Sequence, residues 1–426
     1  MSTTTSGHPS RSDQGVSASA TDADHALVQN FSLQSLPDSF YDDPYPTYRA
    51  LRCIDPIRRM PDGSLFLTRH RHLEAIYKDT TRFSSDKKVE FAPKYGTGSL
   101  LYQHHTTSLV FNDPPLHTRV RRLIAGALNA RAIAAMEPAL ITLIDRLLDR
   151  MQERGTADLI DDFAAAIPIE VIGNLLAVPR KERGPLRGWS LAILGALEPA
   201  LSAEAQGRGE RAVAEFLDYL RILAADRRRH PGNPEHDVLT RLIGGEASGE
   251  RLSEPELLQN CIFILNAGHE TTTNLIGNGL ELMMRFPEER RRLIEDPALI
   301  RSAIEEFLRF ESSNQLGNRR VIEDAEIDGV VMPKSTLITL CIGAANRDPE
   351  PFAQPDRLDI GRSPNRHLAF ASGPHACVGL NLARLEGRLA ISRFLARFPN
   401  FSATAPPRRA RRARFRGFTT LPVKLM

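Results

Sequence analysis

A cysteine in a glycine-rich loop, followed directly by a helical pattern, is the feature that most restricts how this chain can fold. Cys377 lies in the segment Phe370–Gly379. The apolar residues after it recur at helical spacing: Val378, Leu382, Leu385 and Leu389. Peptide dipoles at a helix N-terminus favour an anion, so we expect the sulfur to be biased towards the thiolate. Such a sulfur can serve as a nucleophile, a zinc ligand or the axial ligand of a haem.

The other cysteines and the flanking residues help to choose among these roles. Cys53, Cys261 and Cys341 are far apart and form no C-x-x-C pair, which disfavours a zinc site or a disulfide framework. The pattern F-x-x-G-x-H-x-C-x-G resembles the haem-binding loop of cytochrome P450 monooxygenases. This resemblance implies that Cys377 ligates the haem iron, with Phe370, His375 and Gly379 around the cofactor. The alternative is a buried structural cysteine in a turn.

Composition and charge restrict the class of protein. The chain has 426 residues, of which 42% are hydrophobic and 25% are charged, and its net charge is +3. It can bury a large core, and no polyanionic partner such as nucleic acid is implied. It contains no apolar run of about 18 residues, which argues against a membrane span. Scattered cysteines are typical of a reducing compartment, so we expect a cytoplasmic protein.

Helical patterns dominate the chain. A Ser253 and Glu256 capping box begins a long helix that ends near Arg285. Further helices are predicted around 44–52, 140–151, 161–176, 181–196, 205–228 and 297–310. Pro61-Asp62-Gly63 indicates a hairpin, and short strands are expected around 319–322 and 336–341. The sequence therefore predicts a mainly α fold with a minor β region.

The resemblance implies one large P450-like helical domain with small sheets over residues 30–426. Residues 1–29 are rich in Ser, Thr and Asp, and we expect a disordered tail. Residues 84–115 lack sustained periodicity, which indicates a long functional loop. The arginine run at 408–416 is interpreted as a solvated surface loop, although a nucleic-acid arm is conceivable.

A polar cluster interrupts the long helix at residues 267–272. Glycine is costly inside a helix and threonine hydroxyls bond back to carbonyls, which predicts a local distortion with space for a small ligand. The segment resembles the family motif [AG]-G-x-[DE]-T-T. By this resemblance Thr271 would bond to dioxygen or its waters, Glu270 would relay protons, and Ala267 and Gly268 would make room. An ordinary polar stripe on an exposed helix is the alternative.

Several cations are implied to hold the two haem propionates. The segment 113–121 resembles the family pattern D-P-P-x-H-T-x-x-R, and its His and Arg lie four apart on one helical face. Arg320 is a close competitor for one position, and each cation alone could be an ordinary surface residue. The predicted set is His117, Arg121, Arg319 and His375.

A second charged set is predicted to be structural. Glu306 and Arg309 have E-x-x-R spacing, and the resemblance adds Arg357 to form a buried network below the cysteine loop. The polar stretch 312–318 lines the pocket in relatives. Here its side chains either make that pocket polar or bond to backbone in an irregular turn.

The resemblance implies a monooxygenase that uses haem b and O₂ to oxidise a small organic molecule. Electrons would come from NAD(P)H through an external ferredoxin-type donor, which we expect to dock on the Cys377 side at Arg366, Arg384 and Arg388. A peroxide-driven peroxygenase and a non-catalytic haem-based ligand-binding protein are the alternatives. We expect a monomer. An acidic substrate, or simply solvated side chains, is suggested by Lys87, Lys88, Lys94, His104 and His105.

Overall fold

The computed structural model of this chain describes residues 20–234, 237–245 and 251–426. Its α-helices are α1 (Asp22–Gln29), α2 (Asp38–Asp42), α3 (Tyr45–Ile54), α4 (His70–Lys78), α5 (Lys88–Tyr95), α6 (Leu100–Thr107), α7 (Leu116–Ala127), α8 (Ala130–Arg154), α9 (Ala166–Leu175), α10 (Leu186–Gly195), α11 (Ala203–Arg229), α12 (Val238–Gly244), α13 (Glu254–Arg285), α14 (Pro287–Glu295), α15 (Ile300–Phe310), α16 (Ile342–Ala345) and α17 (Leu380–Arg397). Short 3-10 turns are η1 (Leu109–Phe111), η3 (Arg180–Glu182), η4 (Pro297–Leu299) and η5 (Gly373–His375), and η2 (Leu159–Ala164) is π-helical.

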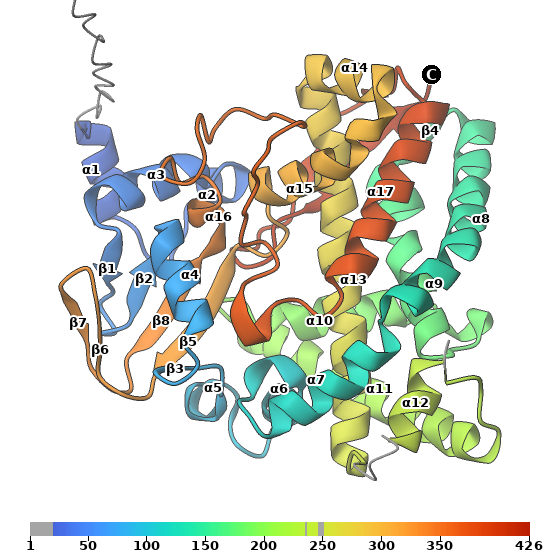
Figure 1. Cartoon of the computed structure of the whole chain (residues 1–426), viewed down its shortest axis with the longest axis horizontal. Helices are drawn as coiled ribbons and strands as arrows, with labels where there is room; N and C mark the ends of the chain where they lie inside the picture. The colour runs from blue at the N-terminus through green and yellow to red at the C-terminus, as the bar shows by residue number, and fades with distance from the viewer. Residues whose placement is uncertain (1–19, 235–236, 246–250) are drawn as a thin grey trace, which may run out of the picture.

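The strands form small sheets beside this helical body. They are β1 (Ile57–Arg59), β2 (Leu65–Leu67), β3 (Phe83–Ser84), β4 (Thr156–Asp158), β5 (Leu316–Val321), β6 (Ala325–Ile327), β7 (Val330–Met332), β8 (Leu337–Cys341), β9 (Ser402–Ala403), β10 (Arg408–Arg409), β11 (Phe418–Thr420) and β12 (Pro422–Lys424). The largest sheet has the order β1-β2-β8-β5-β3, in which only the β2–β8 pair is parallel. Figure 1 shows it on one side of the molecule, with the helical part on the other.

Helix α13 is the axis of the helical part and spans its height in Figure 1. The predicted capping box is confirmed, because the Ser253 side chain accepts from the Glu256 N–H and the Glu256 side chain accepts from the Ser253 N–H. The helix has 32 residues, which at 1.5 Å each gives a length of about 48 Å. Buried side chains lie on nearly all of its faces, as expected for a core helix.

Glycines let three helices meet closely behind the cysteine loop. A Cβ on Gly279 of α13 would lie 2.7 Å from Ile391 Cδ1 of α17 and 3.0 Å from Phe307 Cδ2 of α15. A Cβ on Gly387 of α17 would lie 3.1 Å from Leu275 Cδ2 of α13. Helix α17, which follows the cysteine loop, is therefore held directly against the central helix.

The predicted disordered N-terminal tail is wrong for residues 22–29. Residues Asp22–Gln29 form α1, which begins with a capping box between Thr21 and Asp24. Val28 and Phe31 are buried in an apolar cluster with Phe66 of β2. Apolar residues spaced along a short polar segment were too few to reveal this helix. Residues 1–19 of the predicted tail lie outside the described residues.

The segment 84–115 is also more regular than predicted. It contains α5, α6 and η1, with Pro93 inside α5. Phe91, Tyr95, His105 and Phe111 pack ring against ring, with centroid separations of 5.3–5.6 Å. These helices are one or two turns long and are held by aromatic packing, so they leave little periodicity in the sequence.

Candidate functional site

The cysteine loop has the geometry of a preformed cradle. The Cys377 N–H donates to the Phe370 carbonyl over 2.9 Å, which closes the loop in front of α17. Gly373 has φ +68°, and a Cβ there would lie 2.4 Å from the Tyr77 carbonyl oxygen. Ala371 has φ +55°. An alanine in this left-handed region costs roughly 1–2 kcal/mol relative to the right-handed region.

The expected bias of Cys377 towards the thiolate is wrong for the protein alone. Burial raises the pKa of the thiol, and this outweighs the opposing effects of the Gly379 N–H, Arg121 and Arg384. A thiolate buried here therefore needs a bound cation. Cys377 belongs to no group of three or more His, Cys, Asp or Glu side chains that could hold a metal within the described ranges. This disfavours zinc and fits a metal that arrives with its own planar ligand.

The four predicted propionate partners come together beside the loop. The rings of His117 on α7 and His375 lie with centroids 3.9 Å apart. The pKa of His375 is lowered to about 3, mainly by burial. The positive charges of Arg319, His117 and Arg121 act on it in the same direction. The Arg319 Nε and His375 Nε2 atoms are buried with no hydrogen-bond partner. Two arginines and two histidines, two of them with an unused guanidinium or ring nitrogen, fit a buried anion, so these residues suit the two propionates of a haem.

One face of α13 is more open than the rest of the helix. Phe263, Ala267 and Thr271, spaced four apart, are not fully buried, and Ala267 is exposed in mid-helix, whereas most residues between them are buried. The Thr271 hydroxyl donates to the Ala267 carbonyl over 2.7 Å, as the sequence predicted. The helix stays α-helical throughout, so the predicted distortion does not interrupt it.

Gly268 has a different environment from the one predicted. A Cβ on Gly268 would lie 2.5 Å from Ile172 Cδ1 of α9. The space beside this glycine is therefore filled by a packed side chain and is not left open for a ligand. The resemblance correctly marked the position as small, but the neighbour that requires it could be seen only in three dimensions.

Glu270 lies on another side of α13, where it forms an ion pair with Arg412. Arg412 also bonds to Glu198, with Nε 3.3 Å from Glu198 Oε1. The second oxygen of Glu270, Oε2, is buried without a hydrogen-bond partner. Burial raises the pKa of Glu270, and Arg412 opposes this effect. Glu270, Arg412 and the neighbouring His269 line a cavity of about 800 Å³.

The interpretation of residues 408–416 as a solvated loop is wrong for most of its arginines. Arg416 is buried and donates to Glu311 over 2.7 Å. Arg409 lies 3.6 Å from the same carboxylate, and Arg412 holds Glu270. Only Arg408 and Arg411 fit the prediction, since both are exposed. The acids that bind this segment lie 98 or more positions away, so the sequence run gave no signal of them.

The buried E-x-x-R network exists with a different third member. Glu306 and Arg309 are 0% exposed, and two Arg309 nitrogens each lie 2.7 Å from Glu306 oxygens. Arg362 Nε completes the network at 3.2 Å from both oxygens. Arg357, which the sequence predicted, donates only to Gln354 over 3.3 Å and contributes its backbone carbonyl to Arg309. Asn365 also donates to Glu306 over 3.1 Å.

The polar stretch 312–318 mainly bonds to backbone, as one of its two interpretations held. The Gln315 amide donates to the Ser312 carbonyl over 2.7 Å, and the Ser312 hydroxyl donates to Leu308 over 2.8 Å. Asn318 is an exception because it lines a second cavity and bonds to Arg414.

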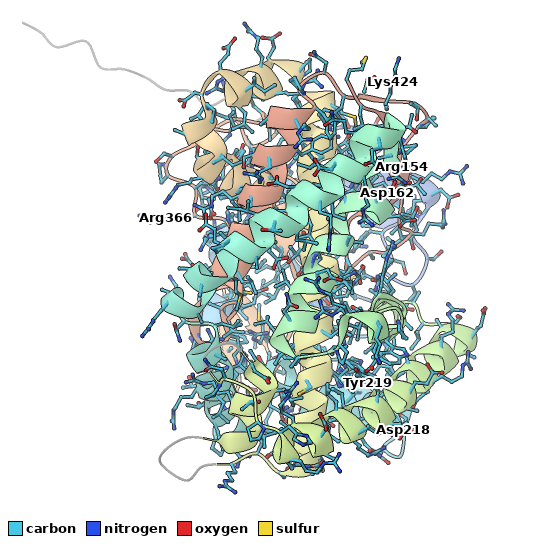
Figure 2. The ribbon with its side chains drawn as sticks, turned by 90° about the vertical axis from the view of Figure 1, so that its right-hand side faces the viewer. Arg154, Asp162, Asp218, Tyr219, Arg366 and Lys424 are labelled. Carbon is cyan, nitrogen blue, oxygen red and sulfur yellow. The ribbon has the colours of Figure 1, made fainter. Side chains whose placement is uncertain are left out.

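The proposed basic docking surface is less uniform than expected. Arg384 is held by Glu305 through two contacts of 2.7 Å, so its charge is already neutralised. Arg366 is exposed, and Figure 2 shows it at the edge of the molecule. Arg388 is half-buried on α17.

Within the described residues, no single helix is long and apolar enough to cross a membrane; the pair Leu116–Ala127 and Ala130–Arg154, bent by 49°, passes by length and composition only. All four cysteines are free thiols. Figure 2 shows α8 running diagonally across the side of the molecule, ending at Arg154, which lies 3.0 Å from Asp162.

Comparison with known proteins identifies the family. The Cytochrome P450 family model matches residues 197–425. The chain is 41% identical over 415 residues to cytochrome P450 107B1 of Saccharopolyspora erythraea, covering 92% of this chain and 97% of that protein. It is 35% identical over 367 residues to the biotin biosynthesis cytochrome P450 of Bacillus subtilis, covering 85% and 91% of the two chains.

Solved structures agree with these relatives. P450BioI, in complex with acyl carrier protein ligated to hexadec-9Z-enoic acid, matches with a TM-score of 0.86 and 34% identity, over 91% of this chain and 100% of that one. The myxobacterial CYP267B1, in complex with myristic acid, matches with a TM-score of 0.84 and 34% identity, over 91% and 98%. The predicted fold class and enzyme class are thereby confirmed. This chain belongs to the cytochrome P450 family, and it is an oxidoreductase of the monooxygenase type.

Proposed function

We propose that this enzyme holds haem b on Cys377 and inserts one oxygen atom of O₂ into a C–H bond of a small organic substrate. The second oxygen atom leaves as water, which consumes two electrons and two protons. The observation that carries the proposal is the cradle loop that holds the part-buried Cys377 thiol near Arg121, with the unpartnered nitrogens of Arg319 and His375 beside it. When bound, the haem supplies the activation of dioxygen.

The chain's own residues would bind and orient the cofactor. Cys377 would ligate the iron, while Phe370 and Gly379 border the loop that holds it. Arg319 and His375 have buried nitrogens without partners, and His117 and Arg121 lie beside them, so these four side chains suit the propionates. Ala267, which is exposed in mid-helix, would leave room for a ligand of the cofactor. Glu306, Arg309 and Arg362 keep the loop's underside rigid.

Two residues of α13 are suited to proton delivery. The Thr271 hydroxyl donates to the Ala267 carbonyl, and its oxygen can still accept a hydrogen bond, so it can order a water molecule. Glu270 Oε2 is unpartnered, and the raised pKa of this carboxyl lets it hold a proton nearer neutral pH than an exposed glutamate. The cavity that Glu270 lines lies beside this carboxyl group.

The electron source and setting are also part of the proposal. NAD(P)H would supply electrons through a ferredoxin-type donor that docks near Cys377, where Arg366 is exposed. We propose that the enzyme works as a monomer in the cytoplasm; its four free thiols support a reducing compartment. Size-exclusion chromatography of the purified enzyme checks the oligomeric state.

The ligation is tested by spectroscopy of the purified full-length protein. After reduction and addition of carbon monoxide, a thiolate-ligated haem gives a Soret band at about 450 nm. Cys377→Ser is expected to lose this band, whereas Cys53→Ser, at an exposed free thiol, keeps it. A protein that binds no haem, or a band that survives Cys377→Ser, contradicts the proposal. Turnover with NAD(P)H, reductase and ferredoxin exceeding that with peroxide separates the monooxygenase from the peroxygenase alternative.

A further inference from the structure

A cavity separate from the one beside Glu270 lies on the sheet side of the helical body. Its volume is about 310 Å³, and it is bordered by the β1–β2 hairpin, α5, the α10–α11 connection and β5. Phe91, Phe111, Leu197 and Leu316 give it an apolar wall. A pocket of this size and lining suits a small apolar molecule.

Three basic side chains also line this cavity: Lys87, Lys94 and Arg414. The Lys94 ammonium donates to the Glu198 backbone carbonyl over 2.9 Å. The Arg414 guanidinium donates to the carbonyls of Leu197 and Leu316 over 3.1 and 2.8 Å, and to the Asn318 side-chain oxygen. Each of these acceptors is a neutral oxygen.

The carboxylates near this cavity already have other hydrogen-bond or ion-pair partners. Glu90 lies 2.7 Å from the Lys87 ammonium. Asp62, at the exposed rim, accepts from the N–H and hydroxyl of Ser64. The carboxylate of Glu198 accepts from Arg412 and from the backbone N–H groups of residues 413 and 414.

Lys94 and Arg414 therefore carry positive charge into a largely apolar space with no carboxylate of their own among the described lining residues. Burial and the charge of Arg414 lower the pKa of Lys94 to about 8, so the ammonium is still the main form at pH 7. Buried cations of this kind are stabilised when an anion binds beside them.

The cavity borders the cofactor cradle. Lys87 lies within electrostatic range of Arg319, the buried arginine of the propionate set. Asn318, which lines the cavity, precedes Arg319 on β5. A molecule held here would lie next to the proposed haem site.

We propose that this cavity binds the substrate as an organic acid, with its carboxylate on Lys94 and Arg414 and its apolar body along Phe91 and Phe111. The inference rests on the monooxygenase function proposed above and specifies the substrate class of that enzyme. Charge-assisted hydrogen bonds to Lys94 and Arg414 would select the ionised acid over neutral molecules of the same shape. The sequence had suggested Lys87, Lys88, Lys94, His104 and His105 as residues that favour an acidic substrate, and the structure narrows this set. Lys88 is exposed and pairs with Asp86. His104 and His105 are buried, and burial is the main cause of their lowered pKa values.

The test uses the haem-loaded, full-length enzyme and two probes of equal chain length, dodecanoic acid and methyl dodecanoate. Isothermal titration calorimetry at pH 7 measures binding of both, and the absorption shift of the ferric haem reports arrival at the iron. The acid is expected to bind about tenfold more tightly than the ester. Lys94→Met is expected to abolish this preference while leaving ester binding unchanged. Lys88→Met, on the same helix, is the matched control and keeps the preference.

Equal affinities for acid and ester in the wild-type enzyme would overturn the inference, as would no saturable binding of the acid. An acid affinity unchanged in Lys94→Met would do the same. Because Arg414 is buried, Arg414→Met is compared only after its carbon monoxide spectrum shows a folded haem site. The two proposals can fail separately. If the enzyme shows the band at about 450 nm and ferredoxin-driven turnover but no preference for the acid, the substrate inference is wrong and the proposed function stands.

Discussion

Arg362 Nε lies 3.2 Å from both carboxylate oxygens of Glu306, at the place where the sequence predicted Arg357. Removing one partner of a buried ion network leaves an unpaired charge, so Arg362→Met is expected to destabilise the enzyme by about 3 kcal/mol. Arg357→Met, which removes an exposed contact with Gln354, is the control and should change stability by less than about 0.5 kcal/mol. Urea unfolding measures both. A larger loss of stability in Arg357→Met than in Arg362→Met would show that Arg357 is the third member of the network.

Gly268 and Ile172 are expected to be coupled. Gly268→Ala would place a methyl group 2.5 Å from Ile172 Cδ1, and such overpacking costs about 1–3 kcal/mol. Ile172→Val removes that Cδ1 atom, so the double variant is expected to recover part of the loss. A double-mutant cycle on thermal unfolding measures the coupling. Additive effects would show that Ile172 does not restrict position 268.

Thr271→Ala is expected to uncouple electron use from product formation. The variant loses the hydroxyl on the open face of α13, so the yield of product per NAD(P)H should fall by at least about tenfold, with peroxide or water formed instead. Thr273→Ala is the matched control because Thr273 also donates to a carbonyl four residues earlier, that of His269, but is buried on another face. Equal coupling in the two variants would remove Thr271 from the proton path.

The docking surface is best tested at Arg366, which is exposed. Arg366→Glu is expected to slow ferredoxin-dependent reduction several-fold at low salt and to leave the carbon monoxide spectrum unchanged. Arg384→Glu is expected to act differently, because it brings a new carboxylate to Glu305 and should lower the thermal stability. Stopped-flow reduction as a function of ionic strength measures the first effect. A reduction rate unchanged in Arg366→Glu excludes that residue from docking.

Glu386 on α17 is expected to make stability depend on pH. Burial raises its pKa from 4.5 to about 8, so between these values the folded state binds more protons than the unfolded state. Stability therefore falls as pH rises through this window, and Glu386→Gln should remove a slope of up to about 1.4 kcal/mol per pH unit. Urea unfolding at pH 5 to 8 measures it, with the exposed Glu204→Gln as control. Identical slopes in wild type and Glu386→Gln would contradict the prediction.

The parts of the fold that the sequence predicted are those governed by local rules. The Ser253 capping box and the Gly63 hairpin act within a few residues, and both appear in the structure as predicted. The cysteine loop and the 267–272 segment were found because their residue types are constrained at fixed spacing. The family resemblance placed His117 and His375 in one propionate-binding set, and the structure brings their rings together although 258 positions separate them.

The parts that were missed depend on long-range contacts. Arg357 and Arg362 are equally plausible in the sequence, and only the path of the chain decides which one reaches Glu306. The helices of residues 84–115 depend on aromatic packing among Phe91, Tyr95 and Phe111. The arginine run appeared solvated because its carboxylate partners are distant in sequence. Glu270 lies on α13, Glu311 directly follows α15, and Glu198 lies between α10 and α11.

The same arginine run has a consequence for synthesis of the protein. Glu198, Glu270 and Glu311 are translated long before Arg412 and Arg416, which neutralise them. While the C-terminal segment is still inside the ribosome, the nascent chain would have to bury Glu198 and Glu270 without Arg412, and Glu311 with Arg285 but without Arg416. These ion pairs can therefore form only after translation ends, and a premature stop codon before residue 408 would release a polypeptide that leaves these carboxylates without Arg412 and Arg416.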